Sequence, residues 1–258
     1  MLWKFHKKDS EVCHFMLGTM HLATDEAYTY VNVAEKYIDK VAVYAGEMDL
    51  NLSVNQNMLP HLTLKDDGKF SSFFRPKQYE KYRKAILKSY KFDILAYDRF
   101  TPFFLNNLLA ESSISTSKNE SLDHYLWTYA TDSEKEMCGI ESFDDQLNVL
   151  RNIPLDYQIK SFRTTVKNIS SFKEKLHKLN QLYLKGDIKE IYRISKKSMG
   201  KIRNLMIYDR NLKMVERIVH LTSEKSTFVA IGAAHMAGKK GLISLLKEKG
   251  YSVSLLKN

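Results

Sequence analysis

The sequence predicts a single α/β domain over residues 1–258, with a central mixed, largely parallel sheet built from both chain ends. Three observations support this prediction. One strand–helix–strand pattern lies near the N-terminus, a second lies near the C-terminus, and the residues between them have mainly helical periodicity. We therefore expect helices to flank the sheet and a helical insertion to occupy approximately residues 155–222.

The N-terminal part of the chain predicts a hairpin followed by a βαβ unit. The apolar segments LWKF and VCHFML flank the polar segment HKKDSE, which is typical of two antiparallel strands and their turn. Thr24 and Asp25 can cap a helix that ends near Asp39, and residues 40–45 predict the next strand. This βαβ unit predicts a parallel strand pair with a right-handed crossover.

The rest of the chain predicts helices up to a final strand–helix–strand unit. The expected elements, in order, are helices at 76–90, 101–112 and 121–130, a strand that ends at 139–141, a helix at 143–153, one long amphipathic helix at 155–184, shorter helices to about 221, a strand at 226–231, a helix at 240–249 and a strand at 251–256. Gly186 and Asp187 end the long helix, and Gly250 is the expected C-cap of the last one.

The composition is ordinary for a soluble globular protein, with 44% hydrophobic and 27% charged residues. No apolar run reaches the roughly 18–20 residues that a membrane span needs. The N-terminal residues MLWKFHKKDSE lack the apolar stretch of a signal peptide, so we expect a cytoplasmic protein. The two cysteines form no Cys-x-x-Cys pair, which argues against a zinc finger.

The positive charge of the chain belongs to one segment. The formal net charge is +10, and residues 160–203 contain 13 basic and 3 acidic residues, so the remainder is balanced. Because the excess is local, we do not expect a nucleic-acid partner. The segment predicts a solvated helix face or, alternatively, a surface that docks on an acidic partner or a membrane.

Four predicted strands end in polar, titratable residues. Two of these ends are Gly-x-x-His motifs, with His21 in GTMH and His235 in GAAH; the other two carry Glu47 and Glu141. Ligands of open α/β sheets bind beyond the carboxyl ends of the strands, and glycines there allow sharp turns and close approach. Two histidines and a carboxylate suit a divalent ion such as Zn²⁺, Mn²⁺ or Co²⁺. The four ends predict a metal site or an acid–base site.

The segments GTMH, GEMD, GIESFDDQL, DRNLKM and GAAHMAGKKGLISLLKEKGYSV together resemble the TraB/PrgY/GumN family, which is related to the Tiki metalloproteases and to the erythromycin esterase and ChaN-like proteins. The resemblance extends from LWKF to GYSV. It places the family's paired motifs on Gly18–His21 and Gly232–His235. Its acidic motifs fall on Glu47-Met48-Asp49 and Gly139-Ile140-Glu141-Ser142, and its Glu-Arg-Asn falls on Asp209-Arg210-Asn211.

The resemblance implies hydrolysis of a peptide or a small molecule at a divalent metal. It implies that His21, Glu47 and His235 are metal ligands or their near neighbours. Glu141 would be the general base, and Arg210 would stabilise the oxyanion. The supporting residues would be Gly18, Gly232, Asp49 and Asn211. Glu47 and Glu141 can exchange the roles of ligand and base, so Glu47 is a catalytic candidate as well. Asp209 is one carbon shorter than the glutamate usual in the family.

Structural alternatives stay open for several of these residues. Arg210 can simply pair with Glu141 or Asp209, and Asp49 can simply cap the turn that follows it. For the whole protein, the alternatives to a metal-dependent hydrolase are a metal-independent, esterase-type hydrolase and a non-catalytic protein that binds a peptide, haem or metal. The sequence does not predict the oligomeric state.

Overall fold

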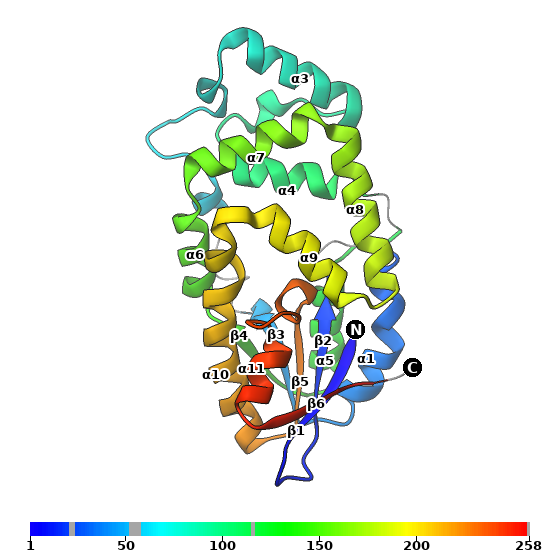
Figure 1. The fold of residues 1–258 in the computed structure, drawn as a ribbon. Helices are drawn as coiled ribbons and strands as arrows, with labels where there is room; N and C mark the ends of the chain where they lie inside the picture. The colour runs from blue at the N-terminus through cyan, green and yellow to red at the C-terminus, as the bar shows by residue number, and fades with distance from the viewer. Residues whose placement is uncertain (21–23, 52–57, 115–116, 257–258) are drawn as a thin grey trace. The chain divides into compact units, whose positions relative to one another are not determined.

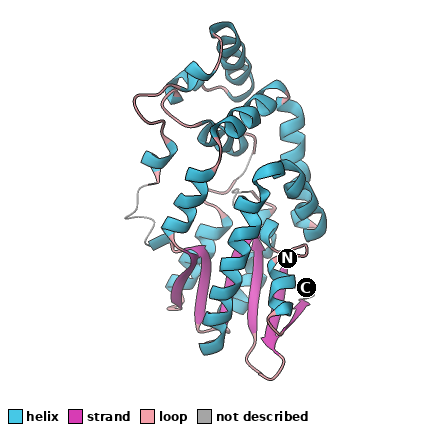
Figure 2. Cartoon of the chain, turned by 60° about the vertical axis from the view of Figure 1, so that its left-hand side comes forward, coloured by secondary structure: helices cyan, strands magenta, loops and turns pink. Residues whose placement is uncertain are grey.

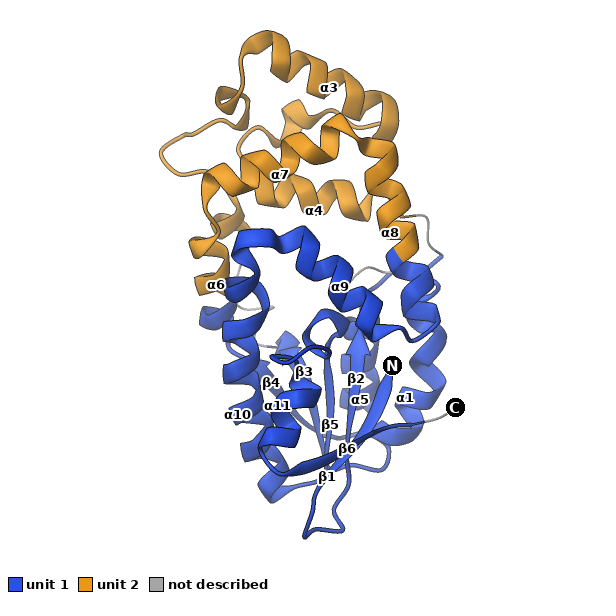
Figure 3. Ribbon diagram, viewed as in Figure 1, with its two compact units in different colours: residues 1–56, 116–146, 179–258 blue, residues 57–115, 147–178 orange. Residues whose placement is uncertain are grey.

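The computed structural model describes residues 1–20, 24–51, 58–114 and 117–256. The chain divides into two compact units, shown in Figure 3. Unit 1 takes residues 1–56, 116–146 and 179–258, and unit 2 takes residues 57–115 and 147–178. The single domain over 1–258 with an insertion at 155–222 stays a prediction.

Unit 1 contains a six-stranded sheet. Its strands, in chain order, are β1 (Leu2–Lys7), β2 (His14–Thr19), β3 (Val43–Met48), β4 (Glu136–Glu141), β5 (Thr227–Gly232) and β6 (Tyr251–Leu255). Their order in space is β4-β3-β5-β2-β1-β6 (Figure 1). Neighbouring strands from β4 to β2 are parallel, and β1 is antiparallel to both β2 and β6. The predicted α/β fold with a mixed, largely parallel sheet is therefore confirmed.

The predicted pairing of the first parallel strands is wrong. β2 and β3 are parallel, but β5 lies between them and pairs with both. All six residues of β2 and all six of β5 are buried, so each of these strands needs a neighbour on both edges. β5, from the C-terminal part of the chain, therefore pairs between β2 and β3, and the order of the strands in the sequence does not reveal this arrangement.

Helices cover both faces of this sheet (Figures 1 and 2). The main helices of unit 1 are α1 (Val31–Ile38), α5 (Leu122–Asp132), α9 (Ile188–Met199), α10 (Asp209–Glu224) and α11 (Leu242–Glu248). α1 and α5 pack against each other. Both also pack on the sheet, where the Tyr37 ring of α1 meets Phe15 of β2 and the Trp127 ring of α5 meets Tyr44 of β3. α10 packs on α11, β4 and β5. These contacts place the first turn of α10 beside the ends of β4 and β5.

Unit 2 is helical and has its own apolar core. Its main helices are α3 (Pro76–Tyr90), α4 (Pro102–Glu111) and α7 (Leu155–Lys167). The fully buried members of the core are Phe70, Ile86, Ile94, Leu105, Leu109 and Phe162.

The helices predicted at 76–90, 101–112 and 121–130 are confirmed as α3, α4 and α5. Thr101 and Ser121 cap the last two, because each hydroxyl accepts a hydrogen bond from the backbone N–H three residues later.

The long helix predicted over 155–184 is wrong. The structure has two helices, α7 and α8 (Ile169–Leu184), separated by Asn168 with φ −137° and ψ 54°. The apolar periodicity continues across this break, so the pattern does not reveal it. Asparagine is a weak helix former because its side chain competes for backbone hydrogen bonds.

The strand predicted at 40–45 begins and ends three residues later, at Val43–Met48. Gly46 and Glu47 therefore lie within β3 and not in a turn after it.

Between β4 and α7 lies α6 (Phe143–Asn152), close to its predicted bounds. Within the described ranges, no helix has both the length and the apolar character needed to cross a membrane.

Candidate active site

The two Gly-x-x-His motifs begin on neighbouring parallel strands. Gly18 pairs with Ile231, and Thr19 pairs with Gly232, so β2 and β5 end at the same edge of the sheet. A Cβ on Gly18 would lie 3.2 Å from the Cα of Ala233, which leaves little room for a side chain. The predicted meeting of the two chain ends is thus observed up to Thr19. His21 lies outside the described residues.

Two side chains that the sequence analysis missed hold the end of β2. The Tyr183 hydroxyl donates to the carbonyl of Gly18 at 2.8 Å, and the Thr19 hydroxyl donates to Asp123 at 2.6 Å. Tyr183 comes from α8 and Asp123 from the first turn of α5, 165 and 104 residues away from their partners in the chain. No local pattern could have identified them, because only the fold brings these helices to the strand end.

Glu47 and Glu141 lie at the same edge of the sheet, on the adjacent strands β3 and β4. Met48 pairs with Glu141, so the two carboxylate-bearing residues are one register position apart. A Cβ on Gly139 would lie only 2.5 Å from the backbone nitrogen of Asp49. The glycine before Glu141 therefore allows the two strand ends to approach closely.

Arg210, in the first turn of α10, bridges the two carboxylates. Its Nε donates to Glu141 Oε1 at 2.9 Å, and its Nη2 donates to Glu141 Oε2 at 2.5 Å and to Glu47 Oε1. Its Nη1 donates to the carbonyl of Met206 at 3.2 Å. These contacts use most of the guanidinium hydrogens. The predicted pairing of Arg210 with Glu141 is observed, and Glu47 is a second partner.

This cluster of one arginine and two glutamates is buried. The side chains of Arg210, Glu47 and Glu141 are 12%, 10% and 2% exposed. Burial by itself lowers the pKa of Arg210, but the Glu141 hydrogen bonds and the charges of Glu47 and Glu141 raise it above its ordinary value. The guanidinium is therefore protonated, and it lies between two glutamate side chains in a place with little water.

The carboxylates are held from other directions as well. Glu47 Oε2 accepts a hydrogen bond from the backbone nitrogen of Gly232 at 3.0 Å, so β3 is tied to the second Gly-x-x-His motif. Glu141 Oε2 accepts from Gln146 at 3.2 Å. Gln146 is a supporting residue that the sequence analysis did not name.

A capping box follows Glu141 at the start of α6. The Ser142 hydroxyl accepts from the Asp145 backbone nitrogen at 3.1 Å, and the Asp145 carboxylate accepts from the Ser142 nitrogen at 3.2 Å. The spacing S-x-x-D in GIESFDDQL is the sequence signal for this box. It begins a helix directly after Glu141, and that helix carries Gln146.

The hydrogen bonds of Asn211 define which nitrogen of His235 carries a proton. Asn211 Nδ2 donates to the carbonyls of His235 at 3.1 Å and Lys240 at 2.6 Å, and because a carbonyl only accepts, the amide orientation is determined. Asn211 Oδ1 therefore lies against His235 Nδ1, at 2.5 Å, and that nitrogen must be the donor. In the neutral ring the lone pair is then on Nε2. This is the arrangement that orients metal-ligating and proton-accepting histidines.

The remaining predicted residues have simpler surroundings. Asp49 Oδ1 accepts from the backbone nitrogen of Asn51 at 2.9 Å, which is the turn-capping contact that the sequence left open. Asp209 is exposed at the first position of α10. Gly232 is buried and contributes its backbone N–H to Glu47, as described above.

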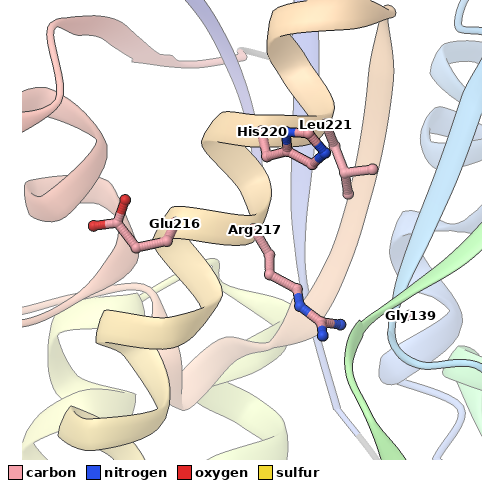
Figure 4. Close-up of a pocket in the computed structure, with 5 residues that line it drawn as sticks. All are labelled: Gly139, Glu216, Arg217, His220 and Leu221. Atoms are coloured by element: carbon pink, nitrogen blue, oxygen red, sulfur yellow. The ribbon is translucent and has the colours of Figure 1, made fainter.

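A surface pocket of about 510 Å³ lies between α10 and β4 (Figure 4). Its lining residues are Gly139, Glu216, Arg217, His220 and Leu221. Arg217 extends toward Gly139, while Glu216 points to the other side of the helix. Arg217 Nη1 donates to the carbonyl of Ile140 at 3.4 Å, and Glu216 pairs with Lys249. None of the predicted catalytic side chains lines this pocket.

The donor set fits a divalent cation only in part. An imidazole with a fixed tautomer and neighbouring carboxylates are ligands that such a cation prefers. Among the residues that the structure describes, however, no three His, Cys, Asp or Glu side chains lie close enough to hold a metal. His235 and Glu47 would therefore need a further ligand, and the sequence offers His21 for that position.

Comparisons with known proteins give a consistent result. A model of the TraB/PrgY/gumN family matches residues 1–255. The chain is 25% identical to the "Metalloprotease TIKI homolog" of Nematostella vectensis, over 58% of this chain and 39% of that protein. It is 23% identical to "Metalloprotease TIKI2" of Xenopus tropicalis, over 93% of this chain and 57% of that protein. The chain thus spans roughly half the length of these curated relatives. No solved structure matches it.

Proposed function

The chain belongs to the TraB/PrgY/gumN family, and we propose that it is a metal-dependent hydrolase that cleaves peptides. The observation that carries the proposal is the convergence of Glu47, Glu141, Arg210 and the Asn211-oriented His235 at one edge of the sheet. The names of its relatives, which are metalloproteases, favour the same chemistry. Those relatives are longer proteins, so their whole activity is not transferred to this chain.

We propose that His235, Glu47 and His21 hold the metal, which can be Mn²⁺, Co²⁺ or Zn²⁺. A bound divalent ion would lower the pKa of a water molecule from about 15.7 toward about 7. Asn211 keeps the proton of His235 on Nδ1, so that Nε2 presents its lone pair. Gly232 and Arg210 orient the Glu47 carboxylate through its two oxygens.

Glu141 is the proposed general base. It would take a proton from the attacking water as the oxygen adds to the peptide carbonyl, and it would pass that proton to the amine when the C–N bond breaks. Arg210 keeps Glu141 oriented through two hydrogen bonds and provides the positive charge that the buried carboxylates need. The role of Arg210 at the oxyanion stays a prediction. To stabilise the oxyanion, Arg210 would have to donate its remaining Nη1 hydrogen, because the others are used in the contacts above. Asp49 supports the turn after β3.

The proposal is tested with protein purified without chelators. We expect a stoichiometric transition metal by elemental analysis and cleavage of unstructured peptides with Mn²⁺, Co²⁺ or Zn²⁺. We expect the variant His235→Ala to lose about 100-fold or more in kcat/KM, while the exposed His220→Ala serves as the matched control. Intact peptides with every metal, or equal activity of the two variants, would contradict the proposal.

A metal-independent, esterase-type hydrolase is the second candidate. The observation in its favour is Arg210, which already gives Glu47 and Glu141 a positive partner. Hydrolysis that survives exhaustive chelation would favour this alternative. Stoichiometric uptake of a peptide, haem or metal without any product would indicate the third candidate, a binding protein.

Location and partners are separate proposals. We propose a cytoplasmic location, and the two half-buried free cysteines, Cys13 and Cys138, are consistent with a reducing compartment. We also propose that residues 160–203 dock on an acidic partner or membrane surface, because the excess charge of the chain lies there. Salt-sensitive binding to anionic vesicles that is lost on charge reversal at Lys196 and Lys197 would support docking, and salt-insensitive binding would exclude it.

A further inference from the structure

A group of cations surrounds two tyrosines in unit 1. The hydroxyls of Tyr192, in α9, and Tyr208, in the π-helix Asn204–Tyr208, are 2.8 Å apart. Lys196 Nζ lies 5.9 Å from the centre of the Tyr192 ring, and the Arg203 guanidinium and Lys240 Nζ lie 5.7 and 5.2 Å from the centre of the Tyr208 ring. We call these five residues the basic tyrosine cluster.

No carboxylate of the described residues pairs with the cations of this cluster, which are Lys196, Arg203 and Lys240. Arg203 Nε is buried and has no hydrogen-bond partner among the described residues, while its Nη2 donates to the carbonyl of Gly200 at 3.5 Å. A buried donor without a partner is rare in native proteins. A negatively charged ligand beside the exposed Lys196 and Lys240 would balance the charge of the cluster.

The positive charges of the cluster help to lower the pKa of Tyr208, whereas the pKa of Tyr192 is raised. Burial raises the pKa of Tyr208, but the hydrogen bond with Tyr192 and the charges of Arg203 and Lys196 lower it below its ordinary value. Burial and the hydrogen bond with Tyr208 raise the pKa of Tyr192 to about 12. Either hydroxyl can be the donor of this pair, and the lowered pKa of Tyr208 reflects the positive charges beside it.

The cluster and the candidate active site share one loop. A Cβ on Gly238 would lie 2.5 Å from the Tyr192 ring, so Tyr192 packs directly on a residue three positions after His235. Asn211 holds both ends of this loop through the carbonyls of His235 and Lys240. The π-helix that carries Tyr208 leads directly into α10, whose first turn carries Arg210. π-Helical turns of this kind are frequent at functional sites.

We infer that the basic tyrosine cluster binds a carboxylate side chain of the peptide substrate and so selects acidic peptides. This inference rests on the proposed function for its substrate class. The guanidinium of Arg203 matches a carboxylate in shape and charge, Lys196 and Lys240 add positive potential, and a tyrosine hydroxyl can donate a further hydrogen bond. The shared loop places this recognition next to His235.

Binding without turnover tests the inference. Two fluorescein-labelled peptides of equal length, one with three glutamates and one with glutamines at the same positions, are titrated against the full chain without added metal by fluorescence anisotropy. We expect the glutamate peptide to bind about tenfold more tightly. In the double variant Arg203→Gln/Lys240→Gln we expect the two affinities to become equal within about twofold.

A charge-matched control separates the cluster from the general positive charge of the chain. The double variant Lys36→Gln/Lys247→Gln removes two exposed lysines outside residues 160–203 and should keep the preference for glutamate. The exposed single variant Lys196→Gln, which cannot disturb a buried contact, should reduce the preference in part. Equal affinities for both peptides in the unmodified chain, or equal losses in the two double variants, would overturn the inference.

Two small anions distinguish the sources of the negatively charged ligand. Acetate should compete with the glutamate peptide at least as well as inorganic phosphate does at matched ionic strength. Stronger displacement by inorganic phosphate would identify a phosphate site and overturn the inference for acidic peptides. Because no step of the assay needs hydrolysis, a glutamate peptide that binds but is never cleaved would contradict the proposed function alone.

Discussion

Two buried histidines lie toward opposite ends of the adjacent strands β2 and β5, and their surroundings differ completely. His14, at the start of β2, is 2% exposed and lies among the rings of Phe5 and Tyr251. Its Nδ1 accepts a hydrogen bond from the backbone nitrogen of Thr227 at 3.3 Å. His235, which follows β5, is 4% exposed, and its Nδ1 donates to Asn211.

The difference shows that burial alone does not define the chemistry of a histidine. At His14, an N–H donor forces Nδ1 to be the acceptor, so Nε2 carries the proton and the ring is a neutral part of the core. At His235, an amide oxygen forces Nδ1 to carry the proton, so the lone pair of Nε2 is presented. We call the surroundings of His14 the apolar end of the strand pair. We call the surroundings of His235, with Glu47, Glu141 and Arg210, the charged end.

The largest expected effect comes from removing the cation of the charged end. Arg210→Met would leave Glu47 and Glu141 buried without their partner. We expect the free energy of unfolding to fall by about 3–5 kcal/mol, measured by urea denaturation at pH 7. Arg193→Met is the control, because Arg193 pairs with Glu190 at the surface and its side chain is 65% exposed. A similar loss in both variants would contradict the importance of burial.

The next effect belongs to the apolar end and depends on pH. Burial, and to a smaller extent the charge of His6, lowers the pKa of His14 from 6.5 to about 4. The unfolded chain therefore binds this proton first, so the stabilisation is complete above pH 6.5 and is lost as the pH falls toward 4. Unfolding free energy should decrease by about 3 kcal/mol over this range.

Denaturation curves at several pH values measure this effect. The variant His14→Gln lacks the titrating ring, so its stability should depend much less on pH between 7 and 4. The exposed His220→Ala should keep the pH dependence of the unmodified chain. An unchanged pH dependence in His14→Gln would show that another group is responsible.

A smaller effect should follow from loosening His235. Asn211→Ala removes the acceptor of the His235 Nδ1 proton. We expect activity or metal affinity to fall about 10–100-fold, which corresponds to about 1.4–2.7 kcal/mol. Nitrogen NMR spectra of the histidines give a readout that does not depend on activity: His235 should change from the Nδ1–H form to a mixture, while His14 keeps its Nε2–H form. A single unchanged tautomer of His235 would contradict this role.

The smallest effect concerns the helix cap beside the charged end. Ser142→Ala removes the cap of α6 and should lower the free energy of unfolding by about 1 kcal/mol, measured by thermal or urea denaturation. Ser121→Ala removes the cap of α5 and should cost a similar amount. A much larger cost at Ser142 would mean that the cap is coupled to the neighbouring Glu141, in contrast to our expectation.

Local patterns predicted much of this fold. Alternating and continuous apolar runs identified the six strands, and the helices predicted to begin at 101 and 121 were found there, capped by Thr101 and Ser121. The break at Asn168 was missed because the apolar periodicity continues through it. The insertion of β5 between β2 and β3 was missed because strand order depends on long-range pairing, for which the sequence holds no local signal.

At the candidate site, too, the sequence showed the local chemical groups but not their long-range contacts. The Gly-x-x-His pair, the strand-end glutamates and the Asp-Arg-Asn segment were visible as chemical groups in the sequence, because glycine, histidine and carboxylates after apolar runs are recognisable locally. Which groups touch was decided only by tertiary structure. Arg210 meets Glu47 and Glu141 from 163 and 69 positions away, and Asn211 selects the tautomer of His235. Hydrogen bonds act over about 3 Å, so the state of each group depends on neighbours that only the folded chain brings together.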